Sequence, residues 1–195
     1  MISTVALTEL SCLSVDKQEV CRYLGARTVD GVTEGLIAEC EKVALELATP
    51  KAVYIEAEIT VTEDEIDFGF MKVKSHNLAT NLKDCYKAYL FCATLGIGMD
   101  RWFERQIRVS PAKATVFSAV GSSLIESFCD YVNKKIVGEE KSRPRFSCGY
   151  GDFCLEHQKD ILRVLEADKR LGVCLTQSCM MVPVKTVTAV IGIRR

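Results

Sequence analysis

The chain has 195 residues, a formal net charge of −1, 48% hydrophobic residues and 26% charged residues. These values are ordinary for one globular domain with its own core, and the near-neutral charge, with no basic stripe among aromatic residues, argues against a nucleic-acid partner. No apolar run reaches the roughly 18 residues of a membrane helix, and the N-terminus lacks the basic start of a signal peptide. We therefore expect a single cytoplasmic domain over residues 1–195 with no membrane segment.

The N-terminal quarter of the sequence predicts one strand and two helices. Residues 4–10 are expected to form a short strand. Asp16, followed three residues later by Glu19, has capping-box spacing, and the helix that it opens would close near Gly25. A second helix, with apolar residues at helical spacing, is expected over residues 30–47.

The clearest strand pattern in the sequence is the alternation of apolar and polar residues over 53–61. Residues 62–65 are expected to turn the chain, so that 66–73 becomes the hairpin partner of this strand. Gly69 would then be a β-bulge within the partner strand. A short helix over 77–82 is expected to follow.

A buried strand over residues 86–94 is followed by Gly96-Ile97-Gly98 and a helix over 100–109. A glycine-rich turn between a strand and a helix can hold an anion, but two glycines fall short of the dinucleotide fingerprint, so we interpret it as a turn. A long helix is expected over 111–137, with Pro111 at its start. Its apolar stripe comprises Val116, Val120, Leu124, Ile125, Phe128, Val132 and Ile136. Another, polar face carries Ser122, Glu126, Asp130 and Asn133, for which solvation is the plain interpretation.

The C-terminal third predicts a helix over 155–165, a turn at Gly172 and a last strand over 186–193 that is buried on both faces. Strands and helices occur in separate runs and do not alternate strictly. This order favours the α+β class, with an antiparallel twisted sheet and helices packed around it.

The ten cysteines show no metal-binding pattern. No Cys-x-x-Cys occurs in the sequence, and without an export signal the cysteines are expected to be reduced thiols that serve as small apolar residues. A zinc or iron–sulfur site is the alternative, but the irregular spacing does not support it. We expect no metal site, and a redox or metal protein based on cysteine is the weakest functional hypothesis.

The segment Arg145-Phe146-Ser147-Cys148-Gly149-Tyr150 combines a guanidinium, a flexible turn and a phenol within six residues. Arg145 offers a rigid fork for a carboxylate, Gly149 allows close approach of the backbone, and Tyr150 supplies an apolar face with a polar tip. This set suits a small ligand with a carboxylate and a flat ring. The alternative is a surface loop outside the core, with a salt-bridged Arg and a turn Gly.

This segment resembles the Arg-x-x-x-Gly-Tyr motif of the activation domain of cobalamin-dependent methionine synthase, a domain that binds S-adenosylmethionine. The resemblance is clearest over residues 115–192 and includes Glu126-Ser127-Phe128-Cys129-Asp130-Tyr131, Leu175-Thr176-Gln177-Ser178, Met181-Val182-Pro183 and Thr186-Val187-Thr188. Val182 stands where the family has Trp, and the family's N-terminal acidic contact to the ligand has no assigned counterpart in this sequence.

The resemblance implies the fold of that domain and a set of residues that bind S-adenosylmethionine. These residues are Glu126, Glu139, Arg145, Ser147, Gly149 and Tyr150. Arg145 would pair with the carboxylate of the ligand, the two glutamates would offset its positive sulfonium and ammonium groups, and Ser147 would contribute mainly through its backbone. The resemblance implies no catalytic side chain, because the nucleophile in that family is reduced cobalt.

Cobalamin itself is expected only through a partner protein. The chain has two histidines, His76 and His157, and neither lies in the Asp-x-His-x-x-Gly pattern that supplies a cobalt ligand. The resemblance therefore implies a free-standing reactivation subunit, catalytically incomplete alone, that docks on a cobalamin-dependent methionine synthase, with a flavodoxin-type reductant as a further candidate partner. The alternative is a docking module for another corrinoid methyltransferase that does not bind S-adenosylmethionine.

Overall fold

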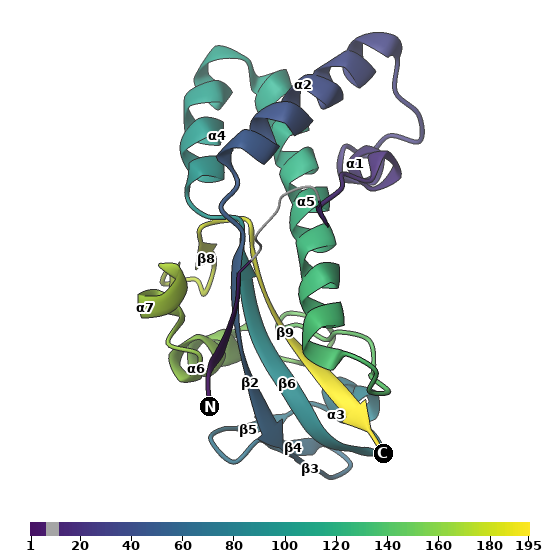
Figure 1. Cartoon of the computed structure of the whole chain (residues 1–195), viewed down its shortest axis with the longest axis vertical. Coiled ribbons are helices and arrows are strands. Elements are labelled where there is room, and N and C mark those ends of the chain that lie inside the picture. The colour runs from purple at the N-terminus through teal and green to yellow at the C-terminus, as the bar shows by residue number, and fades with distance from the viewer. Residues whose placement is uncertain (7–11) are drawn as a thin grey trace.

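A four-stranded antiparallel sheet forms the centre of the computed structural model, which describes residues 1–6 and 12–195 (Figure 1). Its strands lie in the order β1-β2-β6-β9 and comprise Ser3–Ala6, Lys51–Glu58, Cys85–Thr94 and Thr186–Arg194. Successive side chains of β6 point to opposite faces, so that Phe91 belongs to one apolar cluster and Leu90 to another. A sheet that is apolar on both faces needs a covering layer on each.

One face of the sheet is covered by α5 (Pro111–Val137), and the helices α1 (Lys17–Tyr23), α2 (Gly31–Leu47) and α4 (Gly98–Val109) pack against α5. Figure 1 shows α5 running beside the sheet, with α2 and α4 gathered at one end of the molecule. All seven residues of the predicted apolar stripe of α5 are buried, which confirms the long helix.

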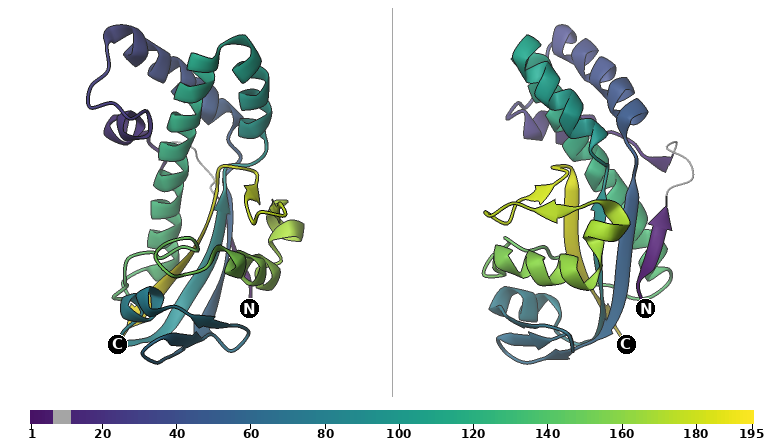
Figure 2. Two further views of the ribbon diagram at one scale, coloured as in Figure 1. Left: turned by 180° about the vertical axis from the view of Figure 1, so that it is seen from behind. Right: turned by 90° about the vertical axis from the view of Figure 1, so that its left-hand side faces the viewer.

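The other face is covered by short helices and two small sheets, on the side away from α5 (Figure 2). The helices are α3 (His76–Asn81), α6 (Gln158–Val164) and α7 (Ala167–Leu171), with the 3₁₀ turn η2 at Leu155–His157 before α6. The small sheets comprise β3 (Thr60–Val61), β4 (Glu65–Asp67) and β5 (Lys72–Lys74), and β7 (Cys174–Leu175) with β8 (Met181–Val182).

The predicted hairpin between residues 53–61 and 66–73 is confirmed only at its tip, where β3 pairs with β4 and the Thr62 amide donates to the Glu65 carbonyl across the predicted turn. The rest of the prediction is wrong, because β2 ends at Glu58 and pairs with β1 and β6, while among the described residues β5 pairs with β4. Gly69, at φ +82°, lies in the turn between β4 and β5 and is not a bulge. The alternating pattern predicts one strand because it continues past Glu58 to Val61, and no Gly or Pro marks the break between β2 and β3 at Ile59.

Two other predictions of the fold are confirmed, and a third is tested only in part. The α+β class with a central antiparallel sheet is confirmed, and β9 is buried on both faces along nearly its whole length. The strand expected over 4–10 begins as β1, but residues 7–10 lie outside the described part of the chain. Within the described residues, no helix combines the length and the apolar character that crossing a membrane requires.

Candidate functional site

Arg145 reaches the middle of α5 and forms two ion pairs there. Its Nη2 atom lies 3.1 Å from Glu126 Oε2 and 3.0 Å from Asp130 Oδ1. These carboxylates are four residues apart on the helix, so they project from one face. The Arg145 side chain is 23% exposed, and its Nη1 atom is buried with no hydrogen-bond partner among the described residues. One nitrogen of the guanidinium is thus committed to α5, and the other keeps unused capacity to donate hydrogen bonds.

The backbone on both sides of Arg145 is paired with β9, which fixes the direction of its side chain. Phe146 and Val190 exchange two backbone hydrogen bonds of 2.9 and 2.8 Å, and the Arg143 amide donates to the Gly192 carbonyl over 2.8 Å. Side chains of a paired segment alternate between its two faces. The isolated bridges to β9 on both sides of Arg145 therefore hold this residue in place beside α5.

Two serine hydroxyls of α5 attach the segment that precedes α1. Ser123 Oγ accepts a hydrogen bond from the Asp16 amide at 2.8 Å, and Ser127 Oγ accepts one from the Ser14 amide at 3.1 Å. The Asp16 carboxylate in turn caps α1 by accepting from the Gln18 amide at 2.7 Å. These contacts place the start of α1 next to the ion pairs of Arg145.

The space between the start of α1, the middle of α5 and Arg145 is a polar cavity of about 350 Å³, which we call the α1–α5 cavity. It is lined by Ser14, Asp16, Glu19, Ser123, Glu126, Ser127, Asp130 and Arg145. Four carboxylates face one guanidinium, so the lining carries an excess of negative charge. Such a cavity suits a ligand with more positive than negative groups, in which one anionic group meets the free nitrogen of Arg145.

The loop after Arg145 turns sharply and is fixed to α3. Gly149, at φ +90°, donates its amide to the Phe153 carbonyl over 2.7 Å, and this backbone conformation favours glycine. The Asp152 carboxylate accepts from the His76 amide at 2.8 Å and so caps α3. Contrary to the expectation that this loop lies outside the core, Phe153 and Cys148 are buried.

The Tyr150 side chain remains 67% exposed, with its ring 6.3 Å from that of Phe146. Tyr23 lies at the end of α1. Burial, followed by the negative charges of Glu126 and Glu19, raises the pKa of Tyr23 above its ordinary value, and Tyr150 also contributes. The Tyr23 ring therefore lies within electrostatic reach of carboxylates on α1 and α5.

The structure brings together some of the predicted site residues but not all of them. Arg145 and Glu126 form an ion pair, while Gly149 and Tyr150 shape the adjoining loop. Ser147 is half-buried, and its carbonyl accepts from the Tyr150 amide at 3.3 Å, so its backbone is already engaged. Glu139 is exposed and lies beyond the end of α5. At a rise of about 1.5 Å per residue, the end of α5 is roughly 16 Å along the helix axis from Glu126.

Sequence reasoning missed the part of the cavity that α1 contributes. Asp16 and Glu19 were assigned only to a helix cap, and neither Ser123 nor Ser127 was assigned to the site. Spacing offered a signal, because Ser123, Glu126, Ser127 and Asp130 follow the i, i+3, i+4, i+7 pattern of one helix face. The predicted polar face of α5 includes Ser122, whereas the face that lines the cavity includes Ser123, one residue further along the helix.

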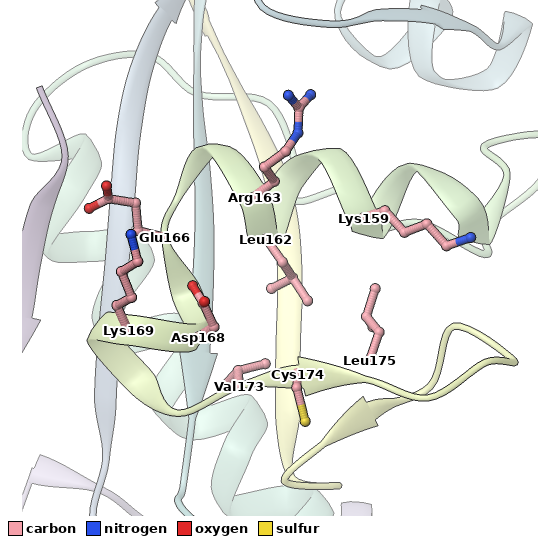
Figure 3. A pocket seen from close by; sticks show the side chains of 9 residues that line it. All are labelled: Lys159, Leu162, Arg163, Glu166, Asp168, Lys169, Val173, Cys174 and Leu175. Atoms are coloured by element: carbon pink, nitrogen blue, oxygen red, sulfur yellow. The ribbon is translucent and has the colours of Figure 1, made fainter.

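A larger surface depression, of about 480 Å³, lies between α6, α7 and β7 (Figure 3). Leu162 and Leu175 face each other across it, whereas Arg163 points away from it. Charged groups of both signs surround this depression without converging on one point, so it is a weaker candidate for a specific site. All ten cysteines are free, and the described residues contain no group of three or more His, Cys, Asp or Glu side chains arranged to hold a metal ion.

No protein-family model matches the sequence, and no curated protein matches it either. Among solved structures, the chain is similar to a crystal structure of the MetH reactivation domain bound to AdoHcy. The two share 14% sequence identity with a TM-score of 0.74, over 98% of this chain and 78% of the other. The chain therefore has the fold of the MetH reactivation domain, as the resemblance at the sequence level predicts.

Proposed function

We propose that the chain binds S-adenosylmethionine in the α1–α5 cavity. The observation that carries this proposal is Arg145, which lines a cavity otherwise rich in carboxylates and whose Nη1 atom has no hydrogen-bond partner among the described residues. The similar reactivation domain was solved with AdoHcy bound, which supports a ligand of this class. S-adenosylmethionine has one carboxylate, one ammonium and one sulfonium, and this combination complements one guanidinium among several carboxylates.

In the proposed complex, the ligand carboxylate accepts from Arg145 Nη1 while Nη2 keeps its ion pairs with Glu126 and Asp130. The ammonium and sulfonium lie towards Asp16, Glu19 and Glu126. The adenosine extends towards Tyr150, whose exposed ring offers a stacking surface. Glu139 and Ser147 stay candidate contacts, Glu139 only if the ligand extends towards the end of α5.

We further propose that the chain is a reactivation subunit that docks on a cobalamin-dependent methionine synthase. Its own residues hold and orient the methyl donor, and the corrinoid is supplied by the partner, because neither His76 nor His157 lies in a cobalt-binding sequence pattern. Methyl transfer to oxidised cobalamin requires prior reduction, for which a flavodoxin-type protein is the proposed electron donor. No further catalytic side chain is required from this chain.

Calorimetric titration with S-adenosylmethionine tests the first proposal. Arg145→Ala removes a charge-assisted contact of roughly 1.5–3 kcal/mol, so affinity is expected to fall about tenfold or more. Arg145→Lys is also expected to weaken binding, because an ammonium cannot reproduce the planar fork. Arg143→Ala is the matched control, since Arg143 lies in the same segment but donates to the Lys83 carbonyl, away from the cavity.

Two outcomes of this titration would contradict the proposal. Unchanged affinity in both Arg145 variants would place the ligand elsewhere. Absence of binding to the wild-type chain would instead favour the second candidate, a docking module that does not bind S-adenosylmethionine. The ion pairs of Arg145 give that candidate its support, because they already neutralise much of the guanidinium charge without a ligand. Co-purification with a corrinoid methyltransferase would then identify the partner.

A further inference from the structure

A second cavity, of about 320 Å³, lies between α4, the first half of α5 and the chain that joins β8 to β9. Its walls are mainly apolar and include Met99, Phe103, Phe117 and Val182. The volume is at the lower end of the range for small-molecule sites, so the cavity fits a compact ligand. It has no lining residue in common with the α1–α5 cavity, and nothing in the proposed binding of S-adenosylmethionine uses it.

Lys185 brings an amine into this apolar cavity. Its Nζ atom donates to Ser118 Oγ over 3.1 Å and to Ser122 Oγ over 2.8 Å. Among the described residues, no carboxylate lies within ion-pair distance of Lys185. An ammonium has three protons to donate, so two hydroxyl partners leave the third uncommitted. Lys185 is half-buried, and a lysine that is partly removed from water usually has an anionic partner.

The fold makes room for this side chain. A Cβ atom at Gly121 would lie 3.0 Å from Lys185 Cε and 2.9 Å from Met99 Cε, so the aliphatic stem of Lys185 crosses α5 where the helix has no side chain. At its backbone, the Lys185 carbonyl accepts from the Leu95 amide over 2.9 Å. Contacts of the Lys185 backbone and of its side chain therefore both fix the position of the amine.

Burial favours the neutral form of the amine. Burial lowers the pKa of Lys185 to about 8, and the negative charge of Asp100 opposes this only in part. Asp100 and Glu104 are the acidic residues that line the cavity. Asp100 accepts from the Val184 amide at 2.8 Å, and burial raises the pKa of its carboxyl. Anionic ligands are disfavoured by these two carboxylates, so a neutral electrophile suits the cavity better.

We propose that this cavity is a site for small apolar aldehydes, which Lys185 captures as an imine. The Nζ lone pair attacks the carbonyl carbon, the π electrons of the carbonyl pass to oxygen, and one Nζ proton moves to that oxygen to form a carbinolamine. The nitrogen lone pair then forms the C=N bond as the hydroxyl leaves as water with a proton from solvent, which gives the iminium that a hydride donor can reduce. The step consumes no oxidant or reductant, and the aromatic walls favour an aromatic aldehyde.

Reductive trapping tests the proposal directly. The purified full chain is treated with a limiting amount of benzaldehyde and cyanoborohydride, and the benzylated lysines are identified by peptide mass mapping. At pH 7.5 we expect Lys185 to be labelled at least about tenfold faster than exposed lysines, because their ordinary pKa is near 10.4. The labelling rate at Lys185 should rise with a midpoint near pH 8.

Two variants and one control sharpen the test. Lys185→Met is expected to lose the fast phase of labelling, and Lys159→Met, which removes an exposed lysine outside this cavity, is expected to keep it. Gly121→Ala keeps the amine but displaces its stem, so labelling should slow several-fold. Labelling spread evenly over the lysines of the wild type, or a midpoint near that of exposed lysines, would overturn the proposal even if both variants failed to fold.

Discussion

At the scale of single residues, Arg145 has a structural role that is independent of any ligand. Its ion pairs with Glu126 and Asp130 tie the loop after α5 back to the middle of that helix. Removing the guanidinium leaves two carboxylates near Asp16 and Glu19 without their only cationic neighbour in the cavity lining. The expectation of a negligible effect on stability, which holds for an isolated surface arginine, therefore does not apply here.

We predict that Arg145→Ala lowers the free energy of unfolding by roughly 1–2 kcal/mol without ligand, a range reduced for the partial exposure of the ion pairs. In the double variant with Glu126→Ala the loss should be less than the sum of the single losses, because the uncompensated carboxylate is also removed. Urea unfolding of the four proteins measures this coupling. Strict additivity would show that the ion pair contributes nothing to stability.

At the scale of elements, α5 carries both cavities on different parts of its surface. Ser118 and Ser122, in its first half, contact Lys185, whereas Ser123 and Ser127, further along, attach the segment before α1. The helix and its apolar stripe could be predicted from the sequence because both depend on local spacing. The α1–α5 cavity could not, because the contact between Asp16 and Ser123 joins residues 107 positions apart through hydroxyl groups that local patterns do not single out.

The serine contacts give a prediction for the mobility of the N-terminal segment. Ser123→Ala combined with Ser127→Ala removes the three hydrogen bonds that these hydroxyls form with Ser14 and Asp16, each of up to about 1 kcal/mol. We expect the amides of Ser14 and Asp16 to exchange with solvent several-fold faster, while the amides of α5 stay protected. Hydrogen–deuterium exchange measures both.

The matched control for this variant is Thr115→Ala. Thr115 lies on the same helix, but its hydroxyl bonds to the Pro111 carbonyl of α5 itself, at 2.9 Å. It should leave exchange in the N-terminal segment unchanged. Equal exchange in the serine variant and the control would mean that apolar packing of α1, through residues such as Val20, is sufficient to hold it.

At the scale of the whole molecule, the sheet separates two layers, and the sequence predicts one of them better than the other. The α+β class follows from the order of strong patterns such as 111–137 and 186–193. In the small sheet of β3, β4 and β5, the pairing of β3 with β4 is predicted by the sequence but the separation of β3 from β2 is not, because very short strands acquire their pairing from tertiary contacts. Likewise, the motif identified Arg145 from local sequence, whereas the acidic half of its site depended on how the layers meet.

The proposed division of labour with a corrinoid partner makes a prediction about the chain as a whole. Mixed with excess cobalamin and passed through gel filtration, the chain alone is expected to retain no cobalamin absorbance. The physical reason is that neither His76 nor His157 lies in a cobalt-binding pattern. A cobalamin-loaded partner should instead carry the chain with it, and retention of one cobalamin per chain without a partner would contradict the proposed role.

The pairing of the chain after α5 with β9 has a consequence for solubility. The outer edge of β9 would otherwise expose unpaired amides and carbonyls, and such an edge is a template for strand addition and aggregation. The contacts of Arg143 and Phe146 cover this edge, and the opposite edge is the four-residue strand β1. The loop that carries Arg145 therefore also prevents the edge of β9 from pairing with another chain. Any change that released it to widen the site would simultaneously expose a strand able to join another molecule.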